Sequence, residues 1–313
     1  MKKKVLLAIV GIAILIVVAL AAAWCLGAFG PSPLKCAAGK TAPEKAEVSP
    51  MSYAPEGTDA ITYINFKKIC SSKIGKALLA DEKVKKELAK AEKESGLTEK
   101  ELTSAEIYWF YNFGKDEQIP QLAAIVCTKN GVPQKALDSL KKDKFTVDGK
   151  PAAKDDEILL VALSKNMLQI SKIDPRASEK DLHALKKGKK PALAKEIDTG
   201  ALISTAFRPD ADSKMQLKAA TQGMLPDDLE LVTANVREKG KNLVIEVVGT
   251  FQKADSAKQV DGALAALLSQ LKQGDAETAE MLKDLKIEAK GKKLVISLKI
   301  ETDKVVTLIK STM

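Results

Sequence analysis

The chain has 313 residues and a formal net charge of +9, with 45% hydrophobic and 29% charged residues. This hydrophobic fraction is normal for a chain that buries a core. Because aromatic residues make up only 4%, that core must consist mainly of Leu, Ile, Val and Ala. Three of the positive charges are the lysines at positions 2–4, and no basic stripe elsewhere is interleaved with aromatic residues. The composition therefore does not support nucleic acid as a partner.

The chain begins with an apolar segment. Residues 5–23 are 19 residues of Val, Leu, Ala, Ile and Gly, preceded by the three lysines and followed by Trp24. A helix of this length spans about 30 Å, the thickness of the hydrocarbon core of a bilayer. The lysines predict a cytoplasmic N-terminus, and Trp24 falls where an interfacial aromatic residue would lie. Residues 1–29 are therefore predicted to anchor the chain in the inner (cytoplasmic) membrane by one span, with the body on the periplasmic side.

Two other interpretations of this segment stay open. Residues 21–23 are three alanines, an A-x-A site at which a signal peptidase would cleave before Trp24, and the protein would then be secreted. The segment is longer than the core of about 7–15 residues that signal peptides use, which favours the retained anchor. Lipoprotein processing at Cys25 is the third interpretation, but it requires a small residue where the chain has Trp24. All three place the body outside the cytoplasm.

Residues 30–59 are predicted to be an extended linker, because prolines recur among Gly, Ser and Lys. Two α+β repeats are predicted to follow, at 60–198 and 199–313. In the first, we expect these elements in chain order: strand 60–66, helix 72–94, aromatic strand 107–113, strand 122–127, helix 132–140, strand 145–147, a hairpin of 158–163 with 167–171, and helix 178–187. The last helix rests on Ser178 and Asp181, which match a capping box.

The second repeat shows clearer patterns. The motif Lys-Gly-Lys-x-Leu-Val-Ile occurs at 239–245 and again at 290–296, each time as a glycine turn that leads into an alternating strand. The expected elements are strand 201–207, helix 214–223, strands 229–236 and 243–251, helix 256–271 ended by Gly274, helix 276–282, a hairpin of 285–289 with 294–300, and helix 304–309. Residues 256–271 carry apolar positions at helical spacing.

Both halves share the order β-α-β-β-α-β, which is that of the split βαβ, ferredoxin-like arrangement. We therefore expect an α+β fold in which two such repeats form an antiparallel-rich sheet with helices on one face.

The chain resembles a loosely defined group of uncharacterised, membrane-anchored exported proteins of planctomycete- and verrucomicrobia-type bacteria. The resemblance lies in the strand and helix of residues 61–78, in the turn at 148–151, and in the strand–helix–strand pattern from 243 to 300. It implies an anchored exocytoplasmic α+β body without known activity, and it carries no site residues across.

The aromatic strand is the best candidate for a binding surface, since it holds five of the thirteen aromatic residues of the chain. On a strand, Trp109, Tyr111 and Phe113 face one way, and Tyr108 and Phe110 face the other. Tyr108, Trp109, Tyr111 and Phe113 are therefore the candidate ligand-binding residues, able to stack on glycan rings or to line an acyl groove. The competing interpretation is a central strand covered on both faces.

Four cysteines lie at 25, 36, 70 and 127, and only Cys70 and Cys127 fall in the predicted body. Export would permit a disulfide between them, and two buried thiols are the alternative. The single histidine, His183, and the lack of a CxxC pair exclude an ordinary zinc site. No cofactor motif or catalytic motif is present. The acidic groups at 155–157 and 227–228 match solvated turns, and the lysines at 141–144 and 186–190 match solvated loops.

These observations favour a non-catalytic envelope protein that binds another protein or assembles with itself. The alternative is a binding protein or sensor for a hydrophobic or glycan ligand that uses the strand at 107–113.

Overall fold

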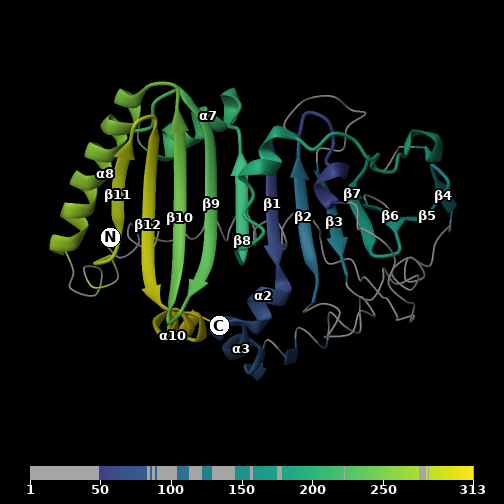
Figure 1. Ribbon diagram of the computed structural model, residues 1–313, viewed down its shortest axis with the longest axis horizontal. Coiled ribbons are helices and arrows are strands. Elements are labelled where there is room, and N and C mark those ends of the chain that lie inside the picture. The colour runs from purple at the N-terminus through teal and green to yellow at the C-terminus, as the bar shows by residue number, and fades with distance from the viewer. Residues whose placement is uncertain are drawn as a thin grey trace. The chain divides into compact units, whose positions relative to one another are not determined.

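The computed structural model describes residues 49–82, 85–86, 89, 104–112, 122–128, 145–155, 158–174, 178–221, 223–274, 280 and 282–312. The predicted anchor, Cys25, Cys36, Phe113, helix 132–140 and most of the linker lie outside these residues. The described chain divides into two compact units, residues 49–203 with 306–312, and residues 204–305. Each is built on antiparallel strands with few helices (Figure 1), which confirms the α+β class and the antiparallel-rich sheet.

The first unit is a sheet whose strands follow the order β1-β2-β3-β7-β6-β5-β4, with antiparallel pairing throughout. The strands are β1 (Ala60–Asn65), β2 (Glu106–Tyr111), β3 (Leu122–Cys127), β4 (Phe145–Val147), β5 (Lys150–Asp155), β6 (Ile158–Ser164) and β7 (Met167–Lys172). The hairpin predicted at 158–171 is confirmed as β6 and β7.

Strand β5 has no counterpart among the predicted elements. Its sequence, KPAAKD, contains neither β-branched nor aromatic residues, so it lacks the usual strand signal. The strand forms because Asp148 and Gly149, both at positive φ (51° and 72°), turn the chain back on β4. Ala153 then packs in a core with Leu160 and Leu168, where only a small side chain is needed on β5.

Two short helices, α2 (Phe66–Ser71) and α3 (Lys73–Leu79), follow β1. The side chain of Asn65 accepts a hydrogen bond from Lys68 N at 2.8 Å and so caps α2. Ser72 is extended and accepts from Gly75 N at 3.0 Å. A Cβ at Gly75 would collide with the carbonyl of Ile69, so glycine permits this tight corner. The helix predicted from residue 72 thus begins at Lys73 and is preceded by a separate turn of helix.

The second unit has strands β8 (Ile203–Phe207), β9 (Leu229–Lys239), β10 (Asn242–Phe251), β11 (Lys286–Lys290) and β12 (Lys293–Glu301), in the order β11-β12-β10-β9-β8. Its helices are α7 (Ala211–Ala220) and α8 (Ala254–Gly274), and α10 (Thr302–Thr312) follows β12. Both predicted glycine turns are confirmed: Gly240 and Gly291 have φ of 63° and 58° and close the hairpins β9–β10 and β11–β12.

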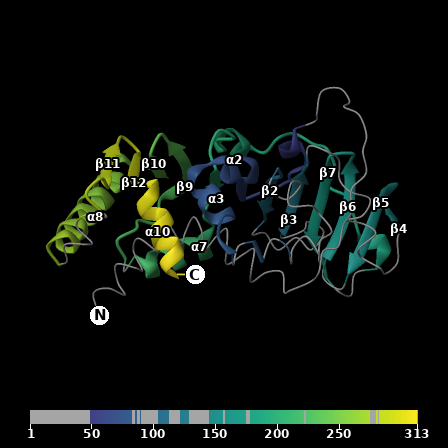
Figure 2. The same ribbon diagram turned by 90° about the horizontal axis from the view of Figure 1, so that it is seen from below.

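Helix α8 covers one face of this sheet (Figures 1 and 2). Its buried residues Ala257 and Val260 pack in one cluster with Leu229, Phe251 and Leu294 from the strands. Buried apolar area of this kind is the main stabilising contribution to such a layer. The apolar face predicted for 256–271 is therefore the face that meets the sheet.

The ferredoxin-like strand order predicted from the element order is wrong. In a split βαβ unit, the two strands joined by a helix are parallel and another strand lies between them. Here β1 and β2 are joined through α2 and α3, yet they pair directly and antiparallel, with Ala60 opposite Tyr111. The reason is that Phe66 N bonds to the carbonyl of Ala105 at 3.1 Å, so the chain leaves and re-enters the sheet at the same end.

Candidate functional site

The aromatic strand lies inside the first unit's sheet, as β2 between β1 and β3. Tyr108, Phe110 and Tyr111 are buried, with 5%, 0% and 7% of their surface exposed. Trp109 is half-buried, and its neighbours across the strands are the small residues Thr62 and Ala124. The structure thus brings three of the four candidate residues together on one strand, mostly as core.

One end of β2 carries a polar group that we call the tyrosine cluster: Tyr63, Asn65, Glu106 and Tyr108. The rings of Tyr63 and Tyr108 lie with centroids 4.9 Å apart. Asn65 Nδ2 donates to Tyr63 Oη at 2.6 Å and to Glu106 Oε1 at 3.3 Å. Tyr108 Oη donates to Glu106 Oε2 at 3.3 Å. Alternation puts these side chains on one face, because each strand contributes residues two apart.

Both phenols of the tyrosine cluster are held in their protonated form. Burial, followed by the negative charge of Glu106, raises the pKa of Tyr63 to about 12. The same two causes, in the same order, raise the pKa of Tyr108 above its usual value. A phenol with a raised pKa donates hydrogen bonds at neutral pH and is a poor general base.

The tyrosine cluster holds a distant segment of the chain. Tyr63 Oη donates to the carbonyl of Thr199 at 3.4 Å. Lys68 Nζ donates to the same carbonyl at 3.0 Å and to that of Gly200 at 2.9 Å. The cluster therefore ties residues 199–200 to the end of β1 and the start of α2, which is a structural role.

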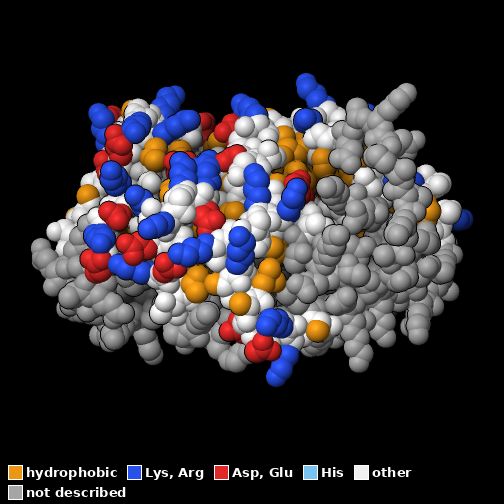
Figure 3. Space-filling model, turned by 60° about the horizontal axis from the view of Figure 1, so that its bottom comes forward, with side chains coloured by type: hydrophobic (Ala, Val, Ile, Leu, Met, Phe, Trp, Pro, Cys, Tyr) orange, Lys and Arg blue, Asp and Glu red, His pale blue; other side chains and the backbone are white. Residues whose placement is uncertain are grey.

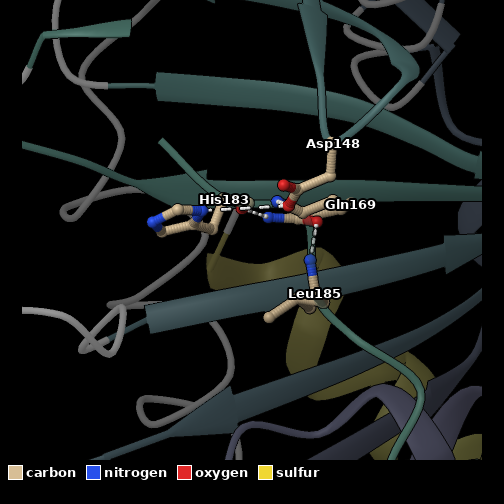
Figure 4. A network of polar contacts seen from close by, with 5 residues as sticks. Asp148, Gln169, His183 and Leu185 are labelled. Atoms are coloured by element: carbon tan, nitrogen blue, oxygen red, sulfur yellow. Dashed lines mark hydrogen bonds and ion pairs between the residues drawn. The ribbon is translucent and has the colours of Figure 1, made fainter. Parts of the chain in front are cut away.

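A second polar network surrounds Gln169 on β7 (Figure 4). Gln169 is fully buried, and its side-chain amide is fully engaged. Oε1 accepts from Leu185 N at 2.7 Å, while Nε2 donates to Ser171 Oγ at 2.9 Å and to the carbonyl of His183 at 3.3 Å. Asp148 Oδ2 accepts from Ala184 N at 3.0 Å and lies 3.8 Å from His183 Nδ1. The network fastens residues 183–185 to β7 and to the β4–β5 turn.

This network explains why the helix predicted at 178–187 is wrong. The predicted capping pair does form, since Ser178 N and Oγ both donate to Asp181 Oδ2, at 3.1 and 2.5 Å. Only the single 3₁₀ turn η2 (Glu179–Asp181) follows. The amides of Ala184 and Leu185 bond to the side chains of Asp148 in the β4–β5 turn and Gln169 in β7 instead of to carbonyls one turn back. Long-range hydrogen bonds to buried groups thus override the local pattern.

The same segment continues into a basic loop, residues 186–190, which are Lys-Lys-Gly-Lys-Lys and are all exposed. Gly188 N donates to the carbonyl of Ser52 at 2.7 Å, so the loop backbone is fixed to the start of the body. None of its four lysines forms an ion pair with any residue that the structure describes. The loop therefore presents four uncompensated positive charges within five residues.

The acidic pair at the end of the α7–β9 connection is divided between two roles. Asp227 is exposed and pairs with Lys218 at 2.9 Å. Asp228 is partly buried, and its Oδ2 accepts from Lys253 N at 3.1 Å and from Ser256 Oγ at 2.8 Å, at the start of α8. The prediction of a solvated turn holds for Asp227. It missed Asp228, because its partners lie 25 and 28 residues away.

Cys70 lies in α2 and Cys127 at the end of β3, both half-buried, and the structure does not join them by a disulfide. In the part of the chain that the structure describes, no three His, Cys, Asp or Glu residues come together as metal ligands. Within the same residues, no helix is both long and apolar enough to cross a bilayer.

No family model matches the sequence, and no curated protein matches it. Among solved structures, crystal form III of a protein named TP0453 resembles the chain with a TM-score of 0.51 and 11% identity, over 85% of this chain and 100% of that chain. Crystal form I of the same protein gives a TM-score of 0.48 and 10% identity, over 85% and 99%. The likeness to form III concerns the fold alone.

Proposed function

We propose that this chain is a non-catalytic protein of the cell envelope. Residues 1–29 anchor it in the inner membrane with the N-terminus in the cytoplasm, and the α+β body stands on the exocytoplasmic side. There it binds another envelope protein or a second copy of itself. The anchor is supported by the lysines at 2–4, the uncharged 19-residue segment and Trp24.

The choice of a protein partner rests on the burial of the aromatic strand. Tyr108, Phe110 and Tyr111 serve the core, and the tyrosine cluster and the Gln169 network serve as internal ties. Among the described residues on the face shown in Figure 3, basic and acidic side chains interleave and apolar side chains gather in small groups. Such side chains can form the polar contacts found at the rim of a protein interface.

The mode of partner binding is constrained by strand β11, which ends the strand order of its unit. Its exposed residues are Lys286, Glu288 and Lys290, and Lys290 pairs with Glu288 at 2.8 Å. Charged side chains of this kind protect an edge strand against pairing with another strand. At this edge, partner contacts are therefore expected through side chains and not through added strands.

Crosslinking in intact cells, followed by identification of the products from isolated membranes, tests this proposal. We expect either one specific crosslink to another protein or a crosslinked homodimer. The yield of the homodimer should fall when the protein is expressed at a lower level. Capture of monomer alone, at every reagent concentration that crosslinks a known membrane complex in the same cells, would contradict it.

Trp109 favours a second candidate function, binding of a glycan or hydrophobic ligand. Its indole is only half-buried, its neighbours across the strands are the small residues Thr62 and Ala124, and an aromatic ring can stack on a flat ligand. Trp109→Ala should then lower binding to an array of glycans or to lipid vesicles at least ten-fold, whereas Trp109→Phe should lower it less. Equal binding by all three forms, with the fold retained by circular dichroism, would remove this candidate.

A further inference from the structure

The basic loop lies beside the point at which the linker enters the body. The linker is predicted to end at residue 59, but the 3₁₀ helix η1 (Pro50–Tyr53) buries Met51, Ser52 and Tyr53, so the body already begins at η1. The 2.7 Å bond from Gly188 N joins the basic loop to Ser52. The tether and the four lysines are therefore on the same part of the first unit.

The backbone of the basic loop is held on both sides. Before it, Gln169 and Asp148 bind the amides of Leu185 and Ala184. After it, the 3₁₀ helix η3 (Ala192–Glu196) begins at once and buries Leu193. Residues 186–190 are exposed throughout, so the lysines are displayed on a pinned backbone with their charges facing solvent.

We propose that the basic loop binds the anionic headgroups of the bilayer that carries the anchor, so that the body docks on the membrane with this part of its surface. The proposal rests on the proposed function, because the bilayer is the partner that the anchor supplies. Uncompensated lysines close to an anionic surface are attracted within about one Debye length, 8–10 Å.

The expected strength follows from the charge count. Each lysine near an anionic bilayer raises the membrane affinity about five-fold, so four lysines give a dissociation constant of about 1 mM. The anchor keeps the body near its own bilayer, at an effective concentration on the order of 1 mM. The body is therefore expected to be docked for about half of the time, and docking should be reversible and sensitive to salt.

The test uses the full chain in nanodiscs made either of phosphatidylcholine alone or with phosphatidylglycerol added. A water-soluble amine reagent labels the lysines, and mass spectrometry follows Lys186, Lys187, Lys189 and Lys190. In the anionic discs, labelling of these four should slow about two-fold or more, and 0.5 M salt should abolish the slowing. Lys239 and Lys241, exposed on either side of Gly240 in the second unit, are the matched control and should label at the same rate in both discs.

A variant in which the four lysines are replaced by glutamine completes the test. Because this variant has no lysine left in the loop, labelling is followed at the nearby Lys180. Any slowing of Lys180 labelling that anionic lipid causes in the wild type should be absent from the variant. Equal labelling of the wild-type loop in both kinds of disc overturns the docking proposal, and so does protection in neutral discs that salt does not change. Alkaline extraction distinguishes a failure of the docking proposal from a failure of the proposed anchor. If the chain leaves the lipid during extraction, residues 1–29 do not anchor it, and the docking proposal is rejected as well.

Discussion

Replacement of the buried Gln169 by alanine should release the basic loop while leaving the rest of the fold in place. Gln169 bonds to the carbonyl of His183 and to Leu185 N, and both residues lie within three positions of the start of the loop. In the variant, Leu185 N loses its acceptor in a buried environment. The consequence should be local opening of residues 183–190.

The size of the effect follows from the two hydrogen bonds that Gln169 makes to residues 183 and 185. The 2.7 Å bond to Leu185 N is the strongest, and leaving a buried donor unpaired costs about 1–3 kcal/mol. The 3.3 Å bond to the carbonyl of His183 is longer and adds about 0.5 kcal/mol. The free energy of local opening should therefore fall by about 1.5–3.5 kcal/mol, which raises the open population about 10- to 300-fold.

Limited digestion with trypsin reads this population, because Lys186, Lys187 and Lys189 are cleavage sites, whereas Pro191 protects the bond after Lys190. Cleavage after these three lysines should accelerate by about the same factor, provided that closing is faster than cleavage. Asn235→Ala is the matched control: it removes a buried amide in the second unit, where Ser204 Oγ donates to Asn235 Oδ1 at 2.7 Å. Unchanged cleavage in Gln169→Ala, or equal acceleration in Asn235→Ala, would refute the role assigned to the network.

Three further predictions concern other parts of the fold. Tyr63, with its pKa raised to about 12, should ionise above the usual value of about 10. The contribution of the raised pKa to stability is therefore complete below pH 10 and lost between pH 10 and 12. The difference in tyrosinate absorbance between wild type and Tyr63→Phe gives the pH at which Tyr63 ionises. A midpoint near pH 10 in the folded protein would contradict the prediction. Asp228→Ala should lower the free energy of unfolding by about 1–2 kcal/mol, because the variant loses the bonds of Asp228 at the start of α8. The variant Asp227→Ala should change the free energy of unfolding by less than about 0.5 kcal/mol. Equal effects of the two variants in urea titrations would count against the division of roles. Gly291→Ala should cost about 1 kcal/mol, because an alanine is strained at a φ of 58°, and a change near zero in the same titration would argue against the observed turn.

The second unit was the more predictable part of the fold. Its strands alternate, and its hairpins turn at Gly240 and Gly291, so the signals that specify them are local. Strand β5 escaped prediction because the small residue Ala153 is enough to fill its place in a core that β6 and β7 build. The false helix at 178–187 had a correct first turn, and the amides that followed were taken by Gln169 and Asp148.

Strand order and burial in the candidate site depend on contacts that no local pattern encodes. The aromatic residues of β2 were found from the sequence, yet their role as core follows from the neighbours β1 and β3. The tyrosine cluster brings together Asn65 and Tyr108, which are 43 positions apart in the sequence, and it also contacts the carbonyl of Thr199. The charge of the basic loop was visible in the sequence, whereas its contact with Ser52 was not.

The topology of the full chain in cells tests the central claim most directly. Spheroplasts that express it are treated with protease from outside, and a second sample is lysed and washed with alkaline carbonate. The account predicts that the chain stays in the membrane pellet after the wash and that external protease degrades the body while a cytoplasmic marker stays intact. A full-length chain that resists the external protease and is recovered in the soluble fraction after lysis would contradict it.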